Sequence, residues 1–84
     1  MKTHYLKTTQ PHFDNIKNGW KNFEIRKNDR DFKEKDLVIL EEFNPLTKEK
    51  SGQQIQAVIG SVLETFPGLE FGYCIFSLIN PVLL

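Results

Sequence analysis

The sequence predicts a small α+β domain, mainly β, with about five strands and one helix near the N-terminus. The chain has only 84 residues, which suits a single domain. Several short runs alternate apolar and polar residues, the pattern of half-buried strands, and Asn, Pro and Gly separate these runs. One stretch near the start has helical spacing instead. The pattern by itself fits several small α+β folds.

The first expected element is a strand over residues 4–8. Alternation places His4 and Leu6 on one side of this strand, and Tyr5 and Lys7 on the other side. We expect His4 to be partly buried and bound to a backbone group. The alternative is that this histidine belongs to a functional site.

A helix is expected from the Thr9-Gln10-Pro11 start to about Asn18. A Thr or Gln side chain supplies its cap, and proline is tolerated in the first turn. Phe13 and Ile16 lie three apart, so they share the face that docks on the sheet. Gly19 then suits the left-handed conformation that ends a helix.

Residues 21–26 form the second expected strand. Phe23 and Ile25 are two apart, which is the spacing of one strand face, and their apolar side chains predict that this face is buried. Glu24 and Arg26 then lie on the opposite face. The charged face is either a solvated surface or the floor of a site.

Residues 37–40 are apolar on both faces, which favours a strand inside a closed or nearly closed barrel. The strand continues to Phe43 and ends at Asn44-Pro45. Residues 46–54 are expected to be a loop or hairpin arm that turns at Ser51-Gly52.

The longest expected strand covers residues 55–66, and its alternation slips at Gly60, which predicts a bulge. A turn at residues 66–69 leads to a last strand over residues 72–78. Residues 79–84 are then an apolar tail that packs on the barrel or on a second copy of the chain. The oligomeric state stays open.

Composition limits the function. Eleven Lys and Arg balance eleven Asp and Glu, so a nucleic acid would have to be bound by a local patch. The single cysteine, Cys74, lies in an apolar run and is expected to be buried, with no disulfide, metal site or cofactor implied. No leader precedes the first strand, and no apolar run approaches the ~20 residues of a membrane helix. We therefore expect a cytoplasmic protein without a membrane partner.

The run Gly19-x-Lys21-x-x-Glu24-x-Arg26 resembles the G-x-K-x-x-E-x-R signature of the activating signal cointegrator homology (ASCH) domain. Residues 26–32, 40–43 and 66–73 resemble a compact bacterial and phage subgroup of the same superfamily. The resemblance covers about residues 4–78. The ASCH family is similar to PUA domains, which are small β-barrels that bind RNA. The resemblance therefore implies one PUA-like barrel across residues 1–84.

The same resemblance implies a site for single-stranded RNA or a nucleotide-like ligand. Lys21 would neutralise a phosphate, Glu24 would accept from the amino group of a base, and Arg26 would grip a phosphate or two base acceptors. The candidate stacking faces are Trp20, Phe43 and Tyr73.

Two neighbouring segments bear on that site. Residues 27–36 form either a solvated loop or a flap over the mouth of the site, which would present Asp29 and Arg30 to the ligand. His12, on the polar side of the helix, is expected to be exposed.

Two other functions stay open. Some small ASCH proteins resemble amidohydrolases that remove an acyl group from a modified cytidine, and others are linked to RNA cleavage. In such an enzyme Lys21 would be nucleophile or base, and Glu24, which stands where the family has threonine, would carry protons. The missing hydroxyl and second carboxylate would come from Ser51, Ser61 or Thr65 and from Glu64 or Glu70. The third function is a phage or mobile-element module that binds another protein.

Overall fold

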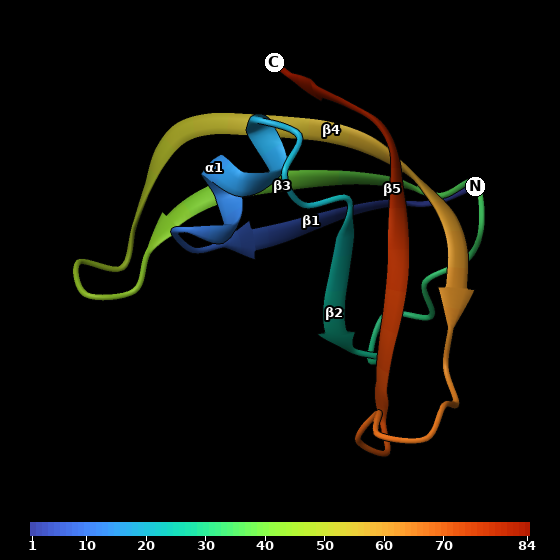
Figure 1. Ribbon diagram of the computed structural model, residues 1–84. Coiled ribbons are helices and arrows are strands. Elements are labelled where there is room, and N and C mark those ends of the chain that lie inside the picture. Colours follow the sequence, from blue (N-terminus) through green and yellow to red (C-terminus); the bar gives the residue numbers. More distant parts are fainter.

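Five strands form one curled sheet and a single helix packs on it in the computed structural model, which describes all 84 residues (Figure 1). The elements are β1 (Thr3–Thr8), α1 (His12–Lys17), β2 (Phe23–Lys27), β3 (Leu37–Asn44), β4 (Glu49–Leu63) and β5 (Tyr73–Leu83). The sheet order is β1-β3-β4-β5-β2, with β1 parallel to β3 and all other neighbours antiparallel. The prediction of a mainly β domain with five strands and one helix is confirmed. No helix has the length and apolar character needed to cross a membrane.

The sheet is a half-barrel rather than a closed barrel, because its edge strands β1 and β2 share no backbone ladder. Two arginine side chains bridge this seam between β1 and the segment that starts with β2. Arg26 Nη2 donates to the Lys7 carbonyl at 2.8 Å, and Arg30 Nη1 donates to the Tyr5 carbonyl at 2.8 Å. An edge strand would otherwise leave such groups to solvent. Side chains therefore close the seam that backbone hydrogen bonds would close in a full barrel.

The core fills the concave side of the sheet. Phe13 and Ile16 of α1 are fully buried there, as predicted, and Cys74 is buried too, which raises the pKa of its thiol. Phe32 reaches in from the loop between β2 and β3, and its ring centroid lies 4.9 Å from that of Phe76. This polar loop is therefore anchored by one aromatic side chain. The cluster comprises Leu6, Phe13, Ile16, Phe32, Val38, Leu40, Ile55, Ala57, Ile59, Cys74, Phe76 and Leu78.

A buried contact between His4 and Asp36 fastens the start of β1. His4 is buried as expected, but its Nε2 lies 2.8 Å from the Asp36 Oδ2 atom, so the predicted backbone partner is wrong. Asp36 also accepts the backbone N–H groups of Lys2 at 3.0 Å and Lys33 at 3.1 Å. The Lys2 N–H, followed by His4, lowers the pKa of Asp36 to about 2. One carboxylate thus joins the first strand to the turn that precedes β3.

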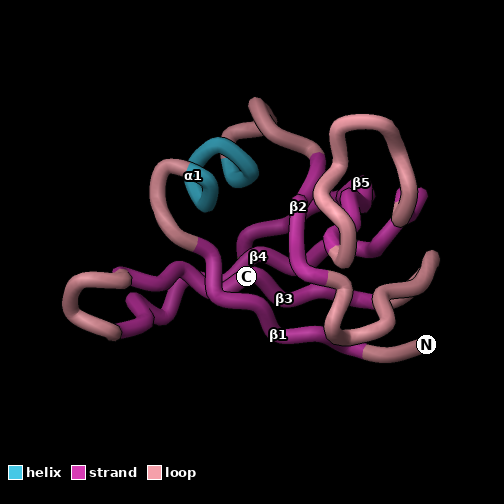
Figure 2. Tube along the Cα trace, turned by 90° about the horizontal axis from the view of Figure 1, so that it is seen from below, coloured by secondary structure: helices cyan, strands magenta, loops and turns pink.

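The connection between β3 and β4 is a tight turn at residues 45–48, and both views show the resulting hairpin projecting from the sheet (Figures 1 and 2). The predicted turn at Ser51-Gly52 is therefore wrong, since both residues lie inside β4. The reason is local: the Asn44 side chain accepts the Leu46 N–H at 2.9 Å, and Lys48 takes a left-handed φ of 63°. Such Asn-initiated turns close a hairpin without glycine.

The predicted apolar tail is mostly strand. β5 continues through residue 83, where Leu83 pairs with Ile55 of β4. Asn80 has a φ of 49° and the pairing register shifts beside it, which takes Pro81 out of the regular ladder. Proline lacks an N–H group, so a strand can continue past it only at an edge or an irregularity of this kind. The predicted end of the last strand at residue 78 is wrong, because Asn80-Pro81 was expected to terminate the strand.

The predicted bulge at Gly60 is confirmed, because the register between β4 and β5 shifts between Ile59 and Val62. β4 bends at this part of its course, where it turns downward in Figure 1. A Cβ atom on Gly60 would lie 2.5 Å from the Ser77 hydroxyl oxygen. Close backbone approach is a recurrent use of glycine in a strand.

Gly60→Ala is expected to lower the free energy of unfolding by about 2 kcal/mol, the usual scale of overpacking. The new methyl group displaces the Ser77 hydroxyl, which accepts the Ser61 N–H at 2.8 Å. Urea denaturation measures the effect. The same substitution in a Ser77→Ala background should cost clearly less, and an equal cost in both backgrounds would refute this explanation.

Candidate ligand-binding site

A hollow of about 420 Å³ opens at the C-terminal end of β1, between this strand, α1 and β2. We call it the β1–β2 hollow. It brings together Lys21, Glu24 and Arg26, the three charged residues that the signature singled out. Three of its residues are basic and only one is acidic. The lining residues are Lys7, Thr8, Thr9, His12, Lys21, Glu24, Ile25 and Arg26.

The two faces of β2 are the reverse of the prediction. Glu24 is only 4% exposed, whereas Phe23 is 44% and Ile25 is 51% exposed. The expected burial of the apolar pair is therefore wrong. Apolar burial normally decides the face of a strand, but here the carboxylate turns inward because Arg26 pairs with it there. The reversal leaves an apolar surface outside and an acid inside.

Arg26 makes its bonds to the protein itself. Its Nε donates to Glu24 Oε2 at 2.8 Å, and its Nη2 donates to the Lys7 carbonyl at 2.8 Å and to the Thr8 hydroxyl at 3.3 Å. Three N–H groups of the guanidinium are therefore used in the wall of the hollow. The planar fork suits this task, because its donors are fixed relative to one another. Arg26 orients Glu24 and closes the seam at the same time.

Glu24 has one oxygen without a partner. Oε2 is bonded to Arg26, but Oε1 is buried and has no hydrogen-bond partner. A buried carboxylate oxygen left unpaired is costly, and such groups are rare in folded proteins. Because Glu24 also lines the hollow, this unpaired acceptor makes the hollow a candidate ligand site. The other buried side-chain oxygen without a partner is the amide oxygen of Asn28, and Asn28 does not line the β1–β2 hollow.

Lys21 lies at the exposed side of the hollow. Its Nζ lies 3.1 Å from His12 Nδ1, which accepts a hydrogen bond from it in the tautomer that carries hydrogen on Nε2. His12 is exposed as predicted, yet it faces the hollow. Lys7 Nζ lies 4.8 Å from the centroid of the Phe43 ring. Phe43 lines a different hollow, so Lys21 is the cation whose ammonium group accompanies the inner acceptor here.

The other predicted site residues lie elsewhere. Asp29 and Arg30 line a neighbouring hollow of about 180 Å³, which shares Arg26 with the first. Trp20 is 83% exposed, and neither it nor the half-buried Tyr73 lines any of these hollows. The predicted flap therefore lies beside the β1–β2 hollow rather than over it.

Sequence reasoning missed the contributions of Lys7, Thr8 and Thr9. Thr8 shares the inward parity of His4 and Leu6, and it is 3% exposed. The alternation in the sequence could have predicted that Thr8 points inward. It could not predict that Thr8 lies beside Glu24 and Arg26, because β1 and β2 meet only across the seam.

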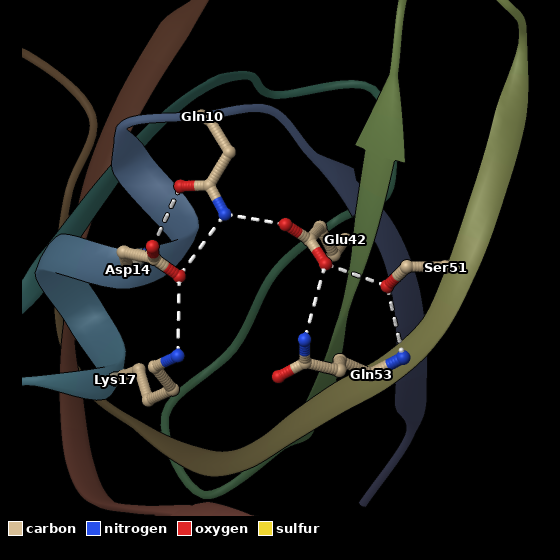
Figure 3. A network of polar contacts seen from close by, with 6 residues as sticks. All are labelled: Gln10, Asp14, Lys17, Glu42, Ser51 and Gln53. Carbon is tan, nitrogen blue, oxygen red and sulfur yellow. Dashed lines mark hydrogen bonds and ion pairs between the residues drawn. The ribbon is translucent and has the colours of Figure 1, made fainter.

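A polar network braces the connection from β1 to α1 (Figure 3). The N-cap of α1 is Pro11, which makes no side-chain cap bond, so the predicted Thr or Gln cap is wrong. The Gln10 side chain, one residue earlier, accepts the Asp14 N–H at 3.1 Å and donates to the Asp14 carboxylate at 3.0 Å and to Glu42. Glu42 also accepts the Ser51 hydroxyl at 2.6 Å, and these bonds, Ser51 first, lower its pKa. Gln10 therefore holds the β1–α1 connection against the β3–β4 hairpin.

A larger hollow of about 560 Å³ lies beside this network, between Gln10 and the hairpin. None of its residues has a buried polar atom without a partner. Ser51 lines this larger hollow. The other residues that a hydrolase would have needed, Ser61, Thr65, Glu64 and Glu70, line neither hollow. No three His, Cys, Asp or Glu side chains converge as ligands for a metal ion.

Comparison with known proteins gives one family. No curated protein matches the sequence. A family model described as "Domain of unknown function (DUF3850)" matches residues 3–78, which run from the start of β1 into β5 and include the whole β1–β2 hollow. Because this match covers most of the chain, the protein belongs to the DUF3850 family.

Proposed function

We propose that the protein binds a nucleotide-like ligand, such as one unit of single-stranded RNA, in the β1–β2 hollow. The observation that carries this proposal is the buried Glu24 Oε1 atom, which lacks a donor. The amino group of a base supplies such a donor, and a carboxylate is a suitable acceptor for it. Lys21 then neutralises the phosphate at the rim.

The charge distribution supports a short ligand. The chain has no net charge, so it offers no general field for a polyanion. The excess of positive charge is local, with three cations and one carboxylate around one hollow. A hollow of about 420 Å³ is within the range of small-molecule sites. One or a few nucleotides match this footprint better than a duplex does.

Two further observations agree with the proposal. The signature from Gly19 to Arg26 resembles that of ASCH domains, and the curled five-stranded sheet is compatible with a PUA-like barrel. PUA-like domains bind RNA, so the proposed relationship and the proposed ligand support each other. In this proposal Arg26 serves mainly to hold Glu24 in place.

Lys21→Ala is expected to weaken binding of a fluorescently labelled single-stranded RNA octamer of mixed sequence by about tenfold, as the loss of one charge-assisted contact implies. Fluorescence anisotropy at low salt measures the affinity. Lys2→Ala is the matched control, because Lys2 precedes the opposite end of β1, and it should bind like wild type. Glu24→Gln should also weaken binding, since an amide replaces the ionised acceptor.

Thermal unfolding of each variant separates binding from folding. The proposal fails if the wild-type protein does not bind the octamer, or if folded Lys21→Ala and Lys2→Ala proteins bind it equally well.

A further inference from the structure

The outer face of β2 is apolar and exposed. Phe23 is 44% and Ile25 is 51% exposed, and both point away from the core. Ile25 pairs across the sheet with Ile75, which pairs in turn with Leu63, itself 40% exposed. Three strands therefore present one apolar stripe to solvent. Contiguous exposed apolar surface of this kind marks interaction sites more often than scattered single residues do.

This stripe and the β1–β2 hollow lie on opposite faces of the edge strand β2. Glu24 faces the hollow, and the side chain of its neighbour Ile25 lies on the exposed face. Lys21 joins the two, since it lines the hollow and its Nζ lies 5.3 Å from the centroid of the Phe23 ring. A chain that leaves the hollow past Lys21 therefore meets an ammonium group and an aromatic ring together.

The charges beside Phe23 are those that a nucleic acid needs. Lys21 lies over the Phe23 ring, and Lys27 is exposed at the other end of β2. β5, the neighbour of β2 in the sheet, contains no charged residue. Unpaired bases stack on exposed aromatic rings while nearby cations hold the phosphates, whatever the base. A purely apolar partner would make no favourable contact with the Lys21 ammonium group above the ring.

From these contacts we infer that the site holds two consecutive units of a single-stranded nucleic acid, one over Glu24 in the hollow and the next stacked on Phe23. This inference rests on the proposed function. The phosphate between the two units lies at Lys21, which exchanges its contact with the Phe23 ring for the phosphate. Phe23 thereby adds affinity for a longer ligand without contacting the first unit.

Competition against the labelled octamer tests this arrangement. The competitors are the four 5′-phosphorylated mononucleotides and the four matching homodinucleotides, each added separately. For the base that binds best, the dinucleotide should compete about tenfold more strongly than the mononucleotide, because one base–aromatic stack is gained. Phe23→Leu should abolish this gain and leave competition by the mononucleotide unchanged. Phe23→Tyr, which keeps an aromatic face, should preserve it.

Phe71→Leu is the matched control, since Phe71 is fully exposed on the loop before β5 and should have no effect on either competitor. Two results overturn the inference while leaving the proposed function intact. One is a wild-type dinucleotide that competes no better than its mononucleotide. The other is a wild-type dimer in size-exclusion chromatography that Phe23→Leu dissociates, because the stripe would then be an interface between copies. Failure of all competitors and of the octamer to bind would refute the proposed function itself.

Discussion

Asp36→Ala is expected to lower the free energy of unfolding by about 4 kcal/mol, because three hydrogen bonds to a buried carboxylate are lost and each contributes about 1.5–3 kcal/mol. The Asp36 carboxylate is buried and accepts from His4, from the Lys2 N–H and from the Lys33 N–H. Alanine leaves three buried or part-buried polar groups without this acceptor. For a domain of this size the melting temperature should fall by roughly 16 °C or more.

Thermal and urea unfolding measure this loss. Glu34→Ala is the matched control, because Glu34 is an exposed acid in the same loop and should change stability by less than about 0.5 kcal/mol. Similar losses for the two variants would show that the three hydrogen bonds of Asp36 contribute little.

The Asp36 carboxylate should also make the free energy of unfolding fall at acid pH. The pKa of Asp36 is lowered from 3.8 to about 2 in the folded protein, chiefly by the Lys2 N–H. A depressed folded pKa stabilises the folded state above the unfolded pKa and loses that contribution as the pH falls through the folded value. Wild-type protein should therefore lose stability between pH 3.8 and about 2 more steeply than Asp36→Asn does.

The elements that the sequence predicted correctly are those decided by neighbours along the chain. The alternation of β1, the buried pair Phe13 and Ile16, and the bulge at Gly60 all follow from local spacing and from the absence of a side chain. Where the structure differs, a partner distant in sequence decides. Asp36 replaces the backbone partner expected for His4, and a register shift carries β5 past its proline.

The candidate site divides in the same way. The signature predicted that Lys21, Glu24 and Arg26 belong together, and they line one hollow. It did not predict that Glu24 turns inward, because hydrophobicity along β2 favours the opposite face. That choice depends on Arg26 pairing with Glu24 while its own fork reaches β1 across the seam. The threonines of β1 become site residues for the same non-local reason.

Arg26→Ala is expected to lower the free energy of unfolding by about 3–5 kcal/mol, because it leaves the buried Glu24 carboxylate without its cation. The Lys7 carbonyl loses its donor at the seam too. Arg30→Ala is the matched control: Arg30 also donates to a carbonyl of β1, but it holds no buried acid, and its loss should cost about 1 kcal/mol. Urea denaturation compares the two.

A double-mutant cycle shows whether the buried charge is the cause. In the wild-type background Glu24→Gln should destabilise, because Arg26 loses its anionic partner. In the Arg26→Ala background the same change should stabilise, by about 1–2 kcal/mol, because a neutral amide is cheaper to bury than an unpaired carboxylate. This reversal of sign requires that Arg26 acts through Glu24. If Glu24→Gln destabilises both backgrounds equally, Arg26 supports the fold only by bridging the seam, and the inward carboxylate has another source of stability.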